Sequence, residues 1–134
     1  WLARIETIHV DRILLSKEPG RDPVALITGA DTAGQQLADD AIQHFRQAAA
    51  LGHHFDAGDH MKYATMLLLT GQTDRALAEG RQLQGTREQQ VLCERVQYFY
   101  YVRGHIDKAQ QFIMELQQGS MPPTIQSTPP PTAG

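Results

Sequence analysis

The sequence predicts an all-α fold of stacked antiparallel helical hairpins, with about five to six helices. Residues 31–118 contain no proline and are rich in Ala, Leu, Gln, Arg and Glu, which favour helices over strands. Within this region two segments match each other at a constant offset, and each begins with a glycine suited to ending a helix. At 134 residues the chain fits one domain with one hydrophobic core.

The domain is expected to span residues 1–118, with an N-terminal helix over residues 1–17 and repeat-like helices over residues 31–118. Two prolines between residues 18 and 23 stop the first helix. Five of the seven prolines lie in residues 119–134, which predicts a disordered Pro-rich tail or linker. Because the chain opens with Trp1 and shows no signal peptide, we expect a piece of a longer protein.

Capping residues place the next helices. Asp31 or Thr32 is expected to begin a helix that runs to about Ala50. Asp59 is expected to be the N-cap of a helix over Asp59–Thr70, and a further helix is expected over about Thr86–Arg103. Apolar residues recur at steps of three and four in both, so each helix should have one buried face.

The internal match joins residues 71–83 to residues 104–116. Gly71 and Gly104 are the expected ends of the first helices, because glycine adopts the left-handed backbone that closes a helix. Asp74 and Asp107 follow three residues later, in the first turn of the second helices, where a carboxylate stabilises the helix dipole by about 0.3–1 kcal/mol. Each pair would form one helix-turn-helix unit.

This pattern resembles the tetratricopeptide repeat (TPR). The residues that carry the resemblance are Gly104, Ala109, Ile113 and Leu116, then Gly71, Ala76 and Leu83, then Ala41, Phe45 and Ala48. The sequence departs from the pattern at Gly80, where a bulky residue is usual. The resemblance implies a superhelical domain that binds a protein or peptide in a groove, as an adaptor, chaperone or scaffold. A helical bundle without repeats is the alternative.

A second resemblance concerns the soluble C-terminal region of bacterial O-oligosaccharyltransferases and O-antigen polymerases. It is carried by Trp1–Leu15, by the run from Lys62 to Gly71 and by Asp74-Arg75-Ala76. It implies a periplasmic accessory domain of a membrane enzyme whose catalytic part lies elsewhere. The domain would be periplasmic in that case and cytoplasmic as a free adaptor.

The expected partner-binding groove is formed by the first helix of each unit. Arginines beside aromatic residues often anchor peptides, and an acidic or carboxylate-ended ligand would suit them. Tyr98 and Tyr101 are the candidates for a shared exposed face, since they lie three residues apart. The favoured interpretation of the aromatic run 98–101 is that it fills the seam between the two repeats. The predicted partner-binding residues are Lys62, Tyr63, Met66, Arg95, Tyr98 and Arg103.

No catalytic site, cofactor or metal is expected. The sequence has no nucleophile elbow, P-loop or dinucleotide fingerprint, and Cys93 has no adjacent histidine. His53, His54 and His60 form the less favoured alternative of a metal site, because imidazoles bind transition metals but this spacing follows no established zinc pattern. The favoured interpretation is a turn between helices.

Charge and hydropathy limit the partners. A net charge of −3 offers no basic excess for binding nucleic acid, so no nucleic-acid partner is expected. The longest apolar run, Tyr63 to Leu69, is far shorter than the roughly 20 residues of a membrane helix, so this segment should not insert into a bilayer. An uncapped stack leaves an apolar end open, which makes a homodimer a further expectation.

Overall fold

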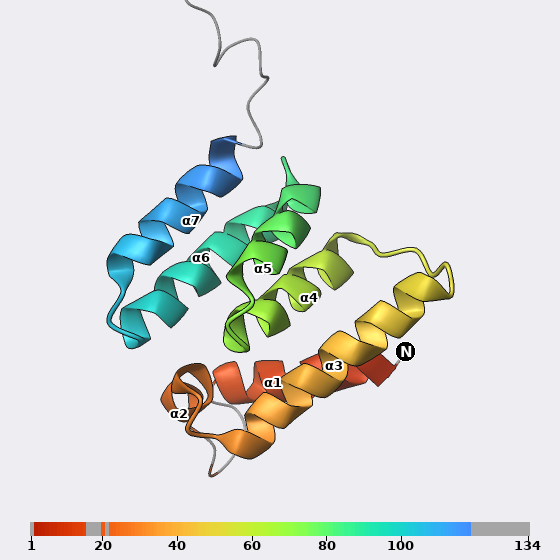
Figure 1. The fold of residues 1–134 in the computed structure, drawn as a ribbon, viewed down its shortest axis with the longest axis horizontal. Helices are drawn as coiled ribbons and strands as arrows, with labels where there is room; N and C mark the ends of the chain where they lie inside the picture. Colours follow the sequence, from red (N-terminus) through yellow and green to blue (C-terminus); the bar gives the residue numbers. More distant parts are fainter. Residues whose placement is uncertain (1, 16–19, 21, 119–134) are drawn as a thin grey trace, which may run out of the picture.

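The computed structural model describes residues 2–15, 20 and 22–118, and this part of the chain is all-α, as predicted (Figure 1). The predicted Pro-rich tail, residues 119–134, lies outside the described residues. The elements are α1 (Leu2–Leu14), α2 (Pro23–Thr28), α3 (Thr32–Ala50), α4 (Ala57–Leu69), α5 (Thr73–Gly80), the short 3-10 helix η1 (Arg81–Leu83), α6 (Arg87–Val102) and α7 (Ile106–Gln118).

Helix α2 is the one that the sequence-based count of five to six left out. Pro23 occupies its first position, where the missing amide proton costs nothing and the fixed backbone angle favours a helix. The side chain of Asp22 caps it by accepting a hydrogen bond from the backbone N–H of Val24 at 3.0 Å. Gly29 ends it with a left-handed φ of 87°.

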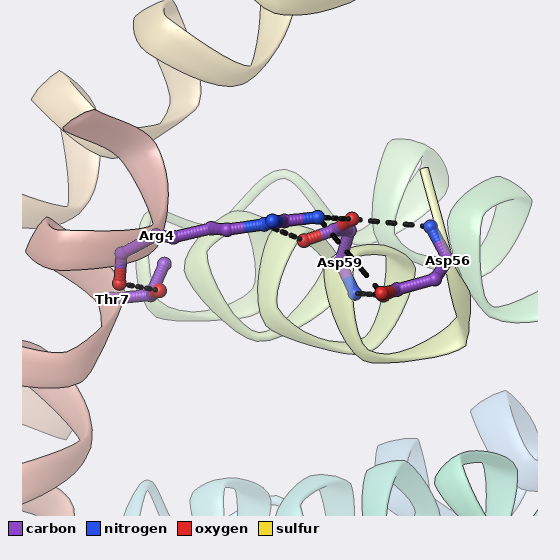
Figure 2. Close-up of polar contacts among 4 residues, drawn as sticks. All are labelled: Arg4, Thr7, Asp56 and Asp59. Carbon is purple, nitrogen blue, oxygen red and sulfur yellow. Dashed lines mark hydrogen bonds and ion pairs between the residues drawn. The ribbon is translucent and has the colours of Figure 1, made fainter. Parts of the chain in front are cut away.

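The start of α3 is confirmed, whereas the start of α4 is corrected. Asp31 caps α3, and its carboxylate accepts the backbone N–H of Gly34 at 3.0 Å. The N-cap of α4 is Asp56, three residues before the predicted Asp59. The two acids form a capping box, in which each carboxylate accepts the backbone N–H of the other residue (Figure 2).

The two glycine turns are confirmed and close the pairs α4–α5 and α6–α7. Gly71 and Gly104 have left-handed φ angles of 80° and 78°, which a residue with a side chain adopts only under strain. Each N–H bonds back to a carbonyl of the preceding helix, that of Leu68 or of Tyr101. The following helices begin within two residues, so each pair folds back on itself (Figure 1).

One hydrophobic core includes residues from every helix. Helix α1 packs along α3, α4 lies between α3 and α6, and α7 packs on α6 (Figure 1). Phe45 from α3 and Phe99 from α6 are among the largest fully buried side chains. Among the described residues, no helix combines the length and the apolar character that crossing a membrane requires.

Candidate interaction surfaces

The predicted groove residues of α4 include two that lie in the core. Met66 has 0% of its surface exposed and Tyr63 has 9%, so neither side chain lies on an open face in this structure. Tyr63 stacks on Phe45 with ring centroids 5.0 Å apart, which holds α4 against α3. Lys62, the third predicted residue of α4, is half-buried.

Arg95 binds inside the chain. Its Nη1 donates to Oδ1 of Asp11 in α1 and to the hydroxyl of Thr65 in α4, each at 3.1 Å. Burial raises the pKa of Asp11, and the nearby charge and hydrogen bond of Arg95 offset this only in part. Arg95 therefore ties three helices together, which is a different role from the predicted one.

Arg103 also binds inside the chain. Its Nε donates to the carbonyl of Ile27 at 3.0 Å, and its Nη2 donates to those of Leu68 and Leu69 at 3.0 and 3.4 Å. The guanidinium lies 5.8 Å from the ring centroid of Tyr100. Burial lowers the pKa of Arg103. Two helix C-termini, those of α2 and α4, thus converge on one cation, which complements their dipoles.

These contacts show why the predicted groove is not an open face. Helix α1 contacts α4, and helix α2 contacts α6. Arg95 reaches Asp11 of α1, and Arg103 reaches Ile27 of α2. Tyr98 and Tyr101 are the exceptions, because they are 42% and 72% exposed, as their shared face predicted.

A pocket of about 410 Å³ lies where the start of α5 meets the end of α6 and the first turns of α7. Tyr100 and Phe112, both nearly buried, form its apolar part. The hydroxyls of Tyr100 and Thr73 lie 3.1 Å apart at its wall. Its charged lining residues are Asp74, Arg103, Lys108 and Glu115.

The outer face of α1 carries an apolar stripe that the sequence interpretation missed. Its members are more than half exposed, at 60%, 52%, 51% and 58%: Leu2, Ile5, Ile8 and Leu15. The opposite face of the helix packs into the core through Ala3, Val10 and Ile13. Leu2, Ile5 and Ile8 are spaced three residues apart, next to the separate apolar series that forms the buried face. Two apolar series on one helix are the pattern that could have revealed the stripe.

The candidate metal residues do not converge. His53 and His54 are exposed, whereas the Nδ1 of His60 lies 2.7 Å from Oε1 of Glu79. Within the described ranges, no three His, Cys, Asp or Glu side chains are grouped to hold a metal ion. Cys93 is half-buried, and burial, together with the charge of Glu94, raises the pKa of its thiol.

No protein-family profile matches the chain, and neither a curated protein nor a solved structure is significantly similar to it. The candidate surfaces are therefore argued from their geometry and chemistry.

Proposed function

We propose that this domain is a non-catalytic protein-interaction domain, and that its partner presents an amphipathic helix to the outer face of α1. The observation that carries the proposal is the apolar stripe of Leu2, Ile5, Ile8 and Leu15. Large exposed apolar patches bordered by polar residues are typical of interaction sites.

The shape of the stripe favours a helix as the occupant. Leu2, Ile5 and Ile8 follow one another along one face of α1, and Leu15 lies directly after its last residue, Leu14. The 13 residues of α1 span about 20 Å at 1.5 Å per residue. The stripe is one helix wide, so an apolar ridge of a second helix can pack along it. A partner that presented a broad flat surface would find too little apolar area on either side.

Charge indicates which helix fits. His9 and Arg12 are exposed and share the helical arc of the stripe, at 100° per residue. The acids of α1 lie away from this arc, because Glu6 approaches His44 at 2.6 Å and Asp11 binds Arg95 at 3.1 Å. The acids of residues 2–15 thus lie outside the arc of the stripe, so acidic residues beside the apolar ridge of a partner helix would meet no like charge there.

The test compares partner capture by the wild-type chain, by Ile5→Glu/Ile8→Glu and by the control Met114→Glu. Met114 is 58% exposed and lies on α7, so the control adds a carboxylate away from the stripe. All three should show equal helical circular dichroism, because the changed side chains point outward. The proposal expects a partner that the stripe variant loses and the control retains. The segment of this partner that binding protects from hydrogen exchange should be an amphipathic helix. Capture that is unaffected by the stripe variant contradicts it.

The same stripe supports a second candidate, the periplasmic accessory domain of a bacterial membrane O-oligosaccharyltransferase or O-antigen polymerase. In that case the helix that packs on α1 belongs to the same longer protein. Membrane-spanning helices encoded directly upstream in the gene would favour this candidate, and their absence would favour a free adaptor.

A further inference from the structure

We infer that the pocket between α5, α6 and α7 binds a small amino-acid zwitterion, a ligand with one carboxylate and one ammonium group. This site lies on different helices from the stripe of α1 and does not depend on the proposed function. The inference rests on three properties of the pocket, which are its size, its apolar floor and its charges of opposite sign.

The size and the floor suit a small organic molecule. A volume of about 410 Å³ falls within the range of roughly 300–1,000 Å³ that is usual for ligand pockets. Tyr100 and Phe112 form the apolar floor, against which an aliphatic or aromatic side chain can pack. The hydroxyls of Tyr100 and Thr73 form one hydrogen bond with each other, in which one hydroxyl donates and the other accepts. The accepting hydroxyl keeps its own O–H, which can donate to a ligand.

The cations of the pocket have no acidic partner in the described part of the chain. Arg103 uses Nε and Nη2 on backbone carbonyls, and no hydrogen bond to Nη1 is formed there. Burial of this guanidinium, which no carboxylate neutralises, favours an anionic group beside it. Lys108, which is exposed on the first turns of α7, supplies a second cation to the same lining.

An acid in the same wall extends the preference from an anion to a zwitterion. Asp74 directly follows Thr73, whose hydroxyl reaches Tyr100, and the ring of Tyr100 lies beneath Arg103. No ion pair joins Asp74 to Arg103 or Lys108 among the described residues, although all three line one pocket. A carboxylate would bind near Arg103 and Lys108, and an ammonium group would bind near Asp74.

The lining acids also argue against a simple anion. The two negative charges of Asp74 and Glu115 balance the two positive charges of Arg103 and Lys108. Because these four charges sum to zero, the pocket does not favour an anion over a zwitterion. Glu115 lies two turns along α7 from Lys108, about 10 Å along the helix axis.

The test titrates the whole chain with three probes by NMR and by calorimetry. L-Phenylalanine is a zwitterion, N-acetyl-L-phenylalanine keeps only the carboxylate, and L-phenylalanine amide keeps only the ammonium group. We expect L-phenylalanine to bind with a Kd of the order of 1 mM, as its size allows, and each analogue to bind about 5-fold or more weakly. Amide signals of residues 73–74 and 103–108 should shift.

Two variants locate the charges. Asp74→Asn and Lys108→Gln should each weaken L-phenylalanine about 3- to 10-fold, whereas Glu94→Gln, an exposed acid of α6 outside the pocket, should leave binding unchanged. Asp74 and Lys108 are exposed, so both variants should remain folded, which circular dichroism checks. Absence of binding up to about 20 mM, or equal binding of the three probes, overturns the inference.

Discussion

Arg4 and Asp59 form a two-point contact between α1 and α4. The Nε of Arg4 donates to Oδ1 of Asp59 at 2.8 Å, and its Nη2 donates to Oδ2 at 2.7 Å (Figure 2). Only 2% of the Asp59 side chain is exposed, and Oδ2 also accepts the backbone N–H of Asp56 at 3.1 Å. One carboxylate therefore both completes the cap of α4 and holds α1 in place.

Replacing Asp59 with alanine should destabilise the whole domain. The change removes the capping-box partner of Asp56 and the two hydrogen bonds that the guanidinium of Arg4 donates to Asp59. We expect a loss of about 2–3 kcal/mol in the free energy of unfolding, since charge-assisted hydrogen bonds contribute more than neutral ones. Urea unfolding followed by circular dichroism measures it.

The matched control is Asp56→Asn. Asparagine keeps the oxygen that accepts the backbone N–H of Asp59, so the cap of α4 persists. We expect a change within about 0.5 kcal/mol. Asp56→Asn removes only the longer ion pair of Arg4 with Asp56, at 3.9 Å. A loss for Asp59→Ala no larger than that for Asp56→Asn would therefore contradict the role assigned to the contact between Asp59 and Arg4.

Asp59 and Asp11 should act in opposite directions on the pH dependence of stability. Burial alone would raise the pKa of Asp59, but its bonds to Arg4 and Asp56 outweigh burial and lower it below 3.8. Asp59 therefore stabilises the folded state fully when the pH is above its ordinary pKa of 3.8, and this stabilisation is lost as the pH falls through its lowered pKa. Burial raises the pKa of Asp11, so protonation of Asp11 favours the folded state as the pH falls through the raised value towards 3.8.

The measurement is urea unfolding of the wild type, Asp59→Asn and Asp11→Asn between about pH 2.5 and 7. The stability of the wild type relative to Asp59→Asn should shrink on acidification, most steeply below 3.8. The stability of the wild type relative to Asp11→Asn should grow as the pH falls from the raised pKa of Asp11 to 3.8. Differences that move in the same direction would contradict the assigned pKa shifts.

Local rules predicted most of the helix ends because the residues that cap a helix are close to it in sequence. Gly71, Gly104 and Asp31 needed no tertiary information. Helix α2 could have been predicted in the same way, since Asp22 followed by Pro23 is a cap followed by a favoured first residue.

The interaction surfaces could not be predicted in this way, because exposure depends on which helices meet. Arg95 and Arg103 lie on the expected faces of α6, but Asp11 and Ile27, which bind them, are 84 and 76 residues away in the sequence. Periodicity identified Met66 as a face residue of α4 without showing that this face is buried. The outer face of α1 is exposed for the same reason, since α3 covers only its other side.

Gly80→Ala should destabilise the domain although alanine favours helices. An added Cβ would lie 2.9 Å from Cδ1 of Leu116 and 3.0 Å from Cδ2 of Leu92, and both leucines are fully buried. The φ of Gly80 is −61°, so contact rather than backbone strain decides the outcome. We expect a loss of about 1–2 kcal/mol, as for other overpacked cores.

A double-mutant cycle tests the cause. In a Leu116→Ala background the nearest contact is removed and the one with Leu92 remains, so Gly80→Ala should cost less there than in the wild type. If Gly80→Ala costs the same in both backgrounds, close packing between α5 and α7 does not explain the glycine.

Arg103→Lys should loosen α2 even though it preserves the charge. The three N–H groups of a lysine ammonium lie on one nitrogen, so they cannot reproduce the separated contacts of Nε with Ile27 and of Nη2 with Leu68. We expect a loss of about 1–3 kcal/mol in global stability, because buried carbonyls at the ends of α2 and α4 lose their donors. Hydrogen exchange should accelerate most in α2, which has few other contacts with α6, whereas Arg81→Lys, at an exposed position in η1, should leave exchange in α2 unchanged. Uniform acceleration across all helices would indicate that Arg103 stabilises the core as a whole and does not specifically fasten α2.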